Sequence, residues 1–137
     1  MNPIQLPISV FIPRIPPSLN KWMGGQHPAV RGSAKRLWKR LAWEIMGVEG
    51  PSERYRATLY AGPVFYRVIF YPPDKRHRDL DNYCMTAGKM IADAMTGVVI
   101  VDDRQVRRII FDWGADGHEP GIMFVMARIE DFTKWLE

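Results

Sequence analysis

The stretch VFYRVIFYPPDKRHRDLDNYCMTAGKMIADAMTG, from Val64 to Gly97, decides the fold. Its first eight residues are mostly aromatic or β-branched, which predicts a strand from Val64 to Tyr71, and the two prolines that follow end it. After a polar, basic turn, apolar residues recur at the spacing of one helix face, and Gly97 ends that helix; they are Tyr83, Ala87, Met90, Ile91 and Ala94. The stretch therefore predicts a strand, a basic turn and an amphipathic helix.

The flanking sequence adds a strand and a helix before this stretch and two strands after it. Residues Ile8–Ile12 are β-rich and end at prolines, and Ser33 is a plausible N-cap for a helix with apolar residues at Ala34, Leu37, Trp38, Leu41, Ala42 and Ile45. Between them, residues 20–32 are predicted to form a mobile basic loop. Two later strands, Gln105–Trp113 and Ile122–Ile129, are predicted to pair as a hairpin. The order β-α-β-α-β-β predicts an α+β fold, a mixed sheet with helices packed on it.

Length and composition indicate one small domain spanning residues 1–137. No stretch approaches the length of apolar sequence that a membrane span needs, and residues 1–14 lack the pattern of a secretory signal. The single cysteine, Cys84, excludes an internal disulfide and is consistent with a reducing compartment. A cytoplasmic protein is therefore expected.

The basic residues are unevenly distributed. The net charge is +4, and no acidic residue precedes Glu44, whereas seven basic residues do: Arg14, Lys21, Arg31, Lys35, Arg36, Lys39 and Arg40. Several of them fall on the outer face of the predicted helix, together with Trp43, which makes that tryptophan a candidate contact for DNA or for a second subunit. This distribution suits a polyanion such as nucleic acid, and a solvated basic helix face remains the alternative.

Two aspartates stand at the junction between the basic turn and the helix. If the backbone is extended at Asp79 and Asp81, their side chains project to the same side and can share Mg²⁺, a cation that prefers oxygen ligands. A third acid, Asp102 or Asp103, would complete the cluster, and the neighbouring Arg76 and Arg78 would suit phosphate contacts. The plainer alternative is that these acids cap helices or turns.

Three ordered motifs resemble the RusA family of Holliday junction resolvases. Residues 74–82, DKRHRDLDN, resemble that family's basic run followed by D-L-D-N, and residues 102–106, DDRQV, resemble its D-D-x-x-V element. Residues 16–20, PPSLN, resemble the P-P-S-x-N motif that follows its first strand, and the helix segment KMIADAM at 89–95 is also similar. The resemblance covers roughly Ile8 to Ile129.

The resemblance implies a homodimer that binds four-way DNA junctions and makes paired nicks with Mg²⁺ or Mn²⁺. It maps the metal-binding acids onto Asp79, Asp81 and Asp103, and gives functional roles to Arg78 and Asn82. Asp102 is then a turn residue. Because such genes often travel in phages and prophages, a phage origin is consistent with it.

One departure concerns a lysine. The family commonly has lysine four residues after the second acid of D-L-D-N, where this chain has Met85. Lys89 lies one turn further on and keeps the family-like spacing of four to Asp93. Lys89 would be the phosphate-binding lysine if the helix begins after Asn82; if Asp81 already lies in the helix, Lys89 is about 12 Å further along the axis.

The sequence thus predicts a Mg²⁺-dependent endonuclease that resolves four-way junctions by paired symmetric nicks in DNA recombination and repair, without an organic cofactor. Its predicted catalytic residues are Asp79, Asp81, Asp103 and Lys89, and its predicted DNA contacts are Lys21, Lys35, Arg36, Lys39, Arg40, Arg76, Arg78 and Asn82. Two alternatives remain open: a nuclease acting mainly on forks, flaps or replication intermediates, and a non-catalytic junction-binding protein, which Met85 favours.

Overall fold

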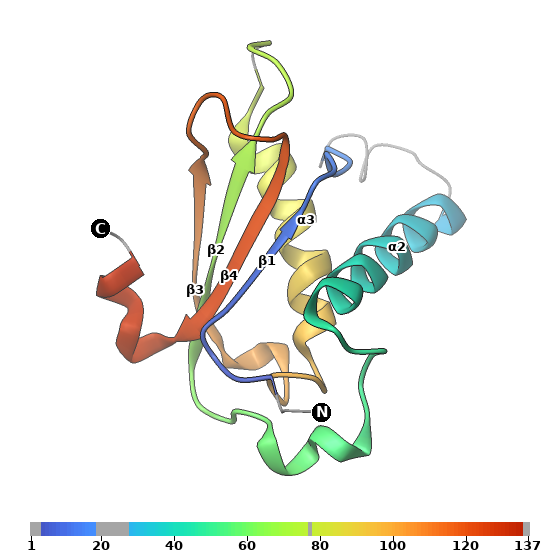
Figure 1. Ribbon diagram of the computed structural model, residues 1–137, viewed down its shortest axis with the longest axis vertical. Coiled ribbons are helices and arrows are strands. Elements are labelled where there is room, and N and C mark those ends of the chain that lie inside the picture. The colour runs from blue at the N-terminus through green and yellow to red at the C-terminus, as the bar shows by residue number, and fades with distance from the viewer. Residues whose placement is uncertain (1–3, 19–27, 77, 136–137) are drawn as a thin grey trace.

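The computed structural model describes residues 4–18, 28–76 and 78–135 of the chain (Figure 1). Its strands and α-helices follow the predicted order and confirm the α+β class: β1 (Ile8–Ile12), α2 (Pro28–Met46), β2 (Val64–Tyr71), α3 (Leu80–Met95), β3 (Val106–Trp113) and β4 (Gly121–Arg128). Short 3-10 helices join them at η1 (Glu53–Thr58), η2 (Asp103–Gln105) and η3 (Ile129–Trp135). Within these residues, no helix combines the length and the apolar character needed to cross a membrane.

The strands form one mixed sheet in the order β1-β4-β2-β3. β4 pairs antiparallel with β1 and with β2, and β2 pairs parallel with β3. The predicted hairpin between the last two strands is therefore wrong, because the chain crosses β2 on its way from β3 to β4. The physical reason is burial: β4 is buried along almost its whole length, and a strand with two apolar faces belongs inside a sheet, whereas β3 is half-exposed and lies at the edge.

Both α-helices cover the same face of the sheet (Figure 1). The core lies between them, where alternate strand residues such as Val10, Val68 and Phe124 meet Trp38 of α2 and Ile91 of α3. On the other face, η3 covers part of the sheet: Phe132 packs edge-on against Phe65, at 5.2 Å between ring centroids. The result is a sheet with one helical layer and a partly covered back.

The helix α2 begins earlier than expected. Residues 28–32 belong to α2, so the predicted N-cap at Ser33 and the predicted extent of the mobile loop are wrong for these residues, and residues 19–27 lie outside the described residues. A proline is well tolerated in the first turn of a helix, because its missing N–H has no partner there, so the helix can begin at Pro28. At the other end, Gly47 has a φ of 76° and ends the helix as expected.

Two polar contacts fix α2 against α3. The indole Nε1 of Trp43 donates a hydrogen bond to the carbonyl oxygen of Ala94 at 2.8 Å, and the ammonium of Lys35 lies 3.2 Å from a carboxylate oxygen of Asp93. Trp43 is thus a structural tie between the helices, and the prediction that it faces DNA or a second subunit is wrong for this structure. The pairing predicted for Asp93 with a basic residue is confirmed.

A glycine lets α3 approach the sheet closely. A Cβ atom at Gly88 would lie 3.0 Å from side-chain carbons of both Tyr66 and Val68 on β2. The helix therefore rests directly on the central part of β2, and it runs from the end of the sheet where β2 finishes back to the end where β3 begins (Figure 1).

Filling this contact should destabilise the fold. We expect Gly88→Leu to lower the melting temperature by about 5 °C or more, since overpacking a core commonly costs about 1–3 kcal/mol. Arg40→Leu, at an exposed position of α2, is the matched control and should have little effect. Calorimetry of the two variants checks this, and equal melting temperatures would contradict the close approach of α3 and β2.

Candidate active site

The first two predicted acids lie at the amino-terminal end of α3. Asp79 is the N-cap residue, with an extended backbone (φ −87°, ψ 123°), and Asp81 is in the first helical turn. Both side chains are exposed, and Asn82 beside them is half-buried. Carboxylates are favourable at this position because the helix dipole is positive there. The extended geometry assumed from the sequence holds at Asp79 but not at Asp81. We call Asp79 and Asp81 the acid pair.

The loop before the acid pair is organised around a buried arginine. The Arg78 side chain is 4% exposed, and its guanidinium donates to the Asp74 carboxylate at 2.7 Å and to the carbonyl oxygen of Arg76 at 3.2 Å. This hydrogen bond from Arg78 lowers the pKa of Asp74 to about 2. Arg78 therefore supports the loop from within, whereas the side chain of Arg76 is exposed and available to a phosphate.

The third predicted acid lies in η2, just before β3. Asp102 caps this turn: its carboxylate accepts from the backbone N–H of Arg104 at 2.9 Å, and Gln105 completes a capping box. The role of Asp102 as a turn residue is thereby confirmed. Hydrogen bonding to Arg104 lowers the pKa of Asp102 to about 2, while the bond with Asp102 and the charge of Asp93 raise the pKa of the exposed Asp103. Asp103 is the carboxylate free of this capping task.

Asp103 opens into a pocket that also contains Lys89. The pocket has a volume of about 170 Å³ and lies between α3 and the edge of the sheet; its lining residues are Tyr66, Lys89, Ala92, Asp93, Asp103, Val106 and Ile109. We call it the Lys89 pocket. Burial, with a smaller contribution from Asp93, raises the pKa of Tyr66 to about 12, so its hydroxyl stays protonated. A lysine, two carboxylates and a phenol thus meet in one hollow.

A single chain keeps the acid pair apart from Asp103. The 16 residues of α3 correspond to about 24 Å of helix. Along the parallel strands, Val64 is level with Val106 and Phe70 with Trp113, so the segment after β2 and the segment before β3 lie at opposite ends of the sheet (Figure 1). Because the helix begins before Asp81, Lys89 lies about 12 Å further along its axis. The structure thus brings Lys89 to Asp103 and not to the acid pair.

This separation decides how a cation fits. Among the described residues, no group of three or more His, Cys, Asp or Glu side chains is placed to hold one metal ion. The three predicted acids of one chain therefore do not fit a single Mg²⁺. The acid pair alone offers suitable donors, because Mg²⁺ often takes one or two protein carboxylates and leaves its other positions to water and phosphate.

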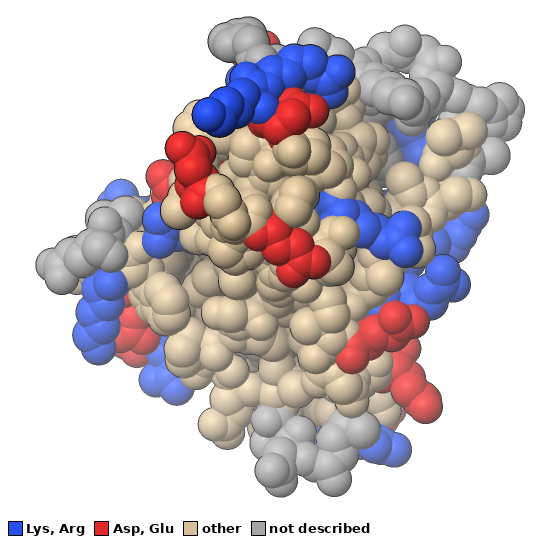
Figure 2. Space-filling view, turned by 45° about the horizontal axis from the view of Figure 1, so that its top comes forward, with Lys and Arg blue, Asp and Glu red and all other residues tan. Residues whose placement is uncertain are grey.

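The basic residues of α2 do not all face outward. Lys35 is paired with Asp93, and the ammonium of Lys39 lies 5.4 Å from the centroid of the Trp43 ring, while Arg36 and Arg40 are exposed. Lys21 lies outside the described residues. On the face that Figure 2 shows, Lys and Arg side chains form separate groups with Asp and Glu side chains between them. The predicted one-sign helix face is thus reduced to its outermost arginines.

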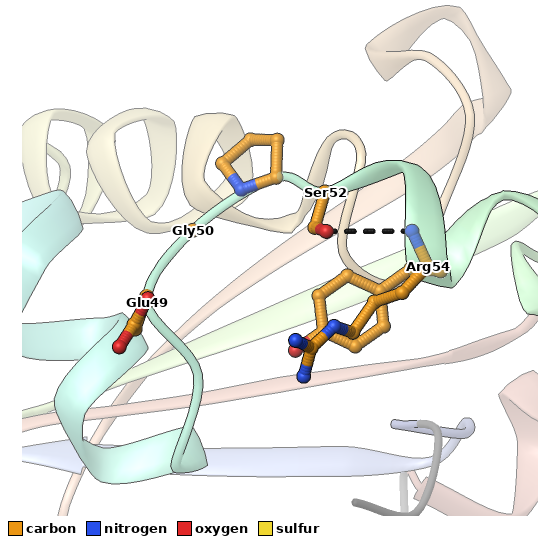
Figure 3. A pocket seen from close by; sticks show the side chains of 6 residues that line it. Glu49, Gly50, Ser52 and Arg54 are labelled. Carbon is orange, nitrogen blue, oxygen red and sulfur yellow. Dashed lines mark hydrogen bonds between the residues drawn. The ribbon is translucent and has the colours of Figure 1, made fainter.

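A second hollow, of about 390 Å³, lies between α2 and η1 and contains none of the predicted site residues. Its lining residues are Glu49, Gly50, Pro51, Ser52, Arg54 and Tyr55. There the Ser52 hydroxyl accepts a hydrogen bond from the backbone N–H of Arg54 at 3.3 Å, which caps η1 (Figure 3). This local role accounts for the polar group that Figure 3 shows, and the hollow adds nothing to the acids and the lysine.

Comparison with known proteins identifies the family. Residues 34–125, more than half of the chain, match the family described as Endodeoxyribonuclease RusA. The chain belongs to this family. It is therefore an endodeoxyribonuclease of the kind that resolves crossover junctions, and nucleases of this family generally depend on a divalent metal. No curated protein matches the chain.

Sequence reasoning missed Tyr66 as part of the site. Its position in an apolar strand gave no signal, because a tyrosine in VFYRVIFY is indistinguishable from a core aromatic residue. Only the packing of α3 shows that its ring borders both Gly88 and the Lys89 pocket.

The buried ion pair predicts a pH dependence of stability. The pKa of Asp74 is lowered from 3.8 to about 2, so its stabilising effect is present above about pH 4 and is lost as the pH falls toward 2. Asp74→Asn, which leaves the Arg78 guanidinium without its carboxylate, should therefore lower the melting temperature clearly at pH 7 and by much less near pH 2. Thermal unfolding of both proteins across this range measures the difference, with the exposed Glu44→Gln as control. A difference that does not depend on pH would contradict this role of Asp74.

Proposed function

We propose that this protein is a Mg²⁺-dependent resolvase that cuts four-way DNA junctions by paired, symmetric nicks in recombination and repair. The observation that carries the proposal is that the family match spans α3 and η2, the two elements that hold Asp81, Lys89 and Asp103. Mn²⁺ would substitute for Mg²⁺, since both accept oxygen ligands. The protein would act in the cytoplasm of a bacterium or of a phage-infected host.

The chain's own residues would divide the work of phosphodiester cleavage. Asp79, Asp81 and Asp103 would hold the cation, which supplies an activated water and neutralises charge on the phosphate. The ammonium of Lys89, in the same pocket as Asp103, would contact a phosphate oxygen and stabilise the negative charge that develops there. Tyr66 remains protonated and can donate a hydrogen bond into that pocket.

Other residues would bind and position the DNA. The exposed side chains of Arg36, Arg40 and Arg76, with Lys21, Lys35, Lys39 and Asn82, are the candidate contacts to the phosphate backbone. Arg78, buried in its own loop, is a positioning residue that holds the segment leading to the acid pair. Affinity should fall steeply with salt, as it does when basic side chains displace counterions.

A homodimer would account for paired nicks. Two identical subunits related by a twofold axis present two equivalent sites, one for each of two opposed strands of a symmetric junction. A preference for forks, flaps or replication intermediates would appear as faster cleavage of those substrates in a panel that includes a four-way junction and a linear duplex.

The acids should be indispensable for cleavage and dispensable for binding. We expect Asp79→Asn, Asp81→Asn and Asp103→Asn each to reduce Mg²⁺-dependent nicking of a synthetic four-way junction by about 100-fold or more, with junction binding retained. Asp116→Asn, in the exposed loop before β4, is the matched control. If the wild-type protein binds junctions but never cuts them with Mg²⁺ or Mn²⁺, the non-catalytic alternative holds instead.

Lys89 should act on the rate rather than on affinity. We expect Lys89→Ala to lower the single-turnover rate of nicking by about 100-fold while the Kd for the junction changes little, because one phosphate contact contributes little to a large interface. Lys75→Ala, an exposed lysine of the loop before α3, should leave the rate unchanged. A rate insensitive to Lys89→Ala would mean that this lysine is only an exposed helix residue.

A further inference from the structure

The two parts of the proposed site lie too far apart in one chain to act on one phosphate. The acid pair is at the amino-terminal end of α3, and Asp103 with Lys89 is toward the other end, across about 24 Å of helix. A phosphodiester and its cation span only a few ångströms. If both parts serve the same reaction, as the proposed function requires, something other than this chain's own fold must bring them together.

The surface between the two parts has the features of an uncovered interface. β3 is the last strand of the sheet and pairs with β2 on one side; on its other side, no strand of the described residues pairs with it. Exposed apolar side chains lie beside this edge: Ile109 is 50% exposed and Trp113 49% exposed on β3, and Met85 is 44% exposed on α3. An open strand edge bordered by apolar side chains is a template for pairing with another strand.

A second copy of the chain fits this edge in a way that would complete the site. A twofold axis perpendicular to the sheet would pair β3 antiparallel with its copy, keep the helices of both subunits on one face, and form a continuous sheet. With Ile109 at the axis, the start of one β3 would lie beside the end of the other. Trp113 marks that end, because it stacks on Phe70 at 5.7 Å, and Phe70 contacts Tyr83 in the first turn of α3 at 4.9 Å.

We propose that the active site is shared between two subunits, with the acid pair contributed by one chain and Asp103 with Lys89 by the other. The pairing across β3 would reduce the distance between the two parts from about 24 Å to the width of one or two strands, about 5–10 Å. A carboxylate from each side can then reach one cation. This inference rests on the proposed function, because it explains how residues needed for one reaction meet.

The charges at the edge are compatible with this pairing. Arg107 donates a hydrogen bond to the carbonyl oxygen of Arg104, and the guanidinium of Arg108 lies 4.7 Å from the centroid of the Phe132 ring on the opposite face of the sheet. Both arginines are thus held away from the helical side, where the axis would bring the two Ile109 side chains together. The residues closest to the axis on that side are therefore apolar.

Subunit complementation tests the proposal. Asp79→Asn and Asp103→Asn chains with different affinity tags are coexpressed, and the heterodimer is purified and given a labelled four-way junction with Mg²⁺. A shared site predicts that each heterodimer has one intact site and one doubly altered site, so it nicks one strand at about half the wild-type rate while either homodimer is inactive. The Asp79→Asn/Asp81→Asn heterodimer is the control, since neither of its sites is intact.

The outcomes separate this inference from the proposed function. Wild-type cleavage, inactive single variants and an inactive Asp79→Asn/Asp103→Asn heterodimer would overturn the shared site and leave the resolvase proposal standing. A wild-type protein that does not cut overturns the proposed function, and the geometry is then decided without activity, by a crosslink.

The crosslink uses a cysteine at the axis. Opposed residues in an antiparallel pair have Cα atoms about 4.5–5.5 Å apart, a distance that a disulfide can bridge. Ile109→Cys should therefore give a covalent dimer on mild oxidation, seen on a non-reducing gel, whereas Ile45→Cys, at a similarly exposed position of α2, should not. The native Cys84 is buried and serves as an internal control in the wild-type chain. Failure of Ile109→Cys to crosslink overturns the pairing across β3.

Discussion

The close contact of α3 with β2 is the constraint on which the rest of the structure depends. Gly88 lets the helix backbone rest against Tyr66 and Val68, and the ties from Trp43 and Lys35 hold α2 beside it. A helix held straight along the sheet acts as a spacer of fixed length. It places the acid pair at one end of the molecule and presents Lys89 and Asp93 to Asp103 toward the other, so the distribution of the catalytic groups follows from core packing.

The family membership and the spacer lead to one account of catalysis. A nuclease of the RusA family needs carboxylates and a cation at the scissile phosphate, yet the described part of one chain holds its acids in two places. The open edge of β3 lies between them and is bordered by apolar side chains. A dimer that closes this edge would couple assembly to activity, so that cutting occurs only where two subunits are aligned on a junction.

Local patterns in the sequence predicted the elements well, and long-range packing is where they failed. The β-rich run Val64–Tyr71 and the apolar face of the helix after it are encoded by neighbouring residues, and both were predicted correctly. The position of β4 between β1 and β2 depends on which strands are buried on both faces, which a hairpin rule cannot detect. For the same reason, the D-L-D-N and D-D-x-x-V motifs indicated the family but not that a helix of 16 residues holds their acids apart. The buried state of Arg78 was equally invisible, because a basic run gives no sign of which member turns inward.

The most direct measurement of the central claim is the position of the cation. A crystal of the full chain with Mn²⁺ and a four-way junction carrying uncleavable phosphates would locate the metal by its anomalous scattering. The account predicts a manganese peak bounded by Asp79 and Asp81 of one subunit and by Asp103 of the other, with Lys89 of that second subunit facing the same phosphate. A peak coordinated by acids of one chain alone, whether the acid pair or Asp93 with Asp103, would contradict it.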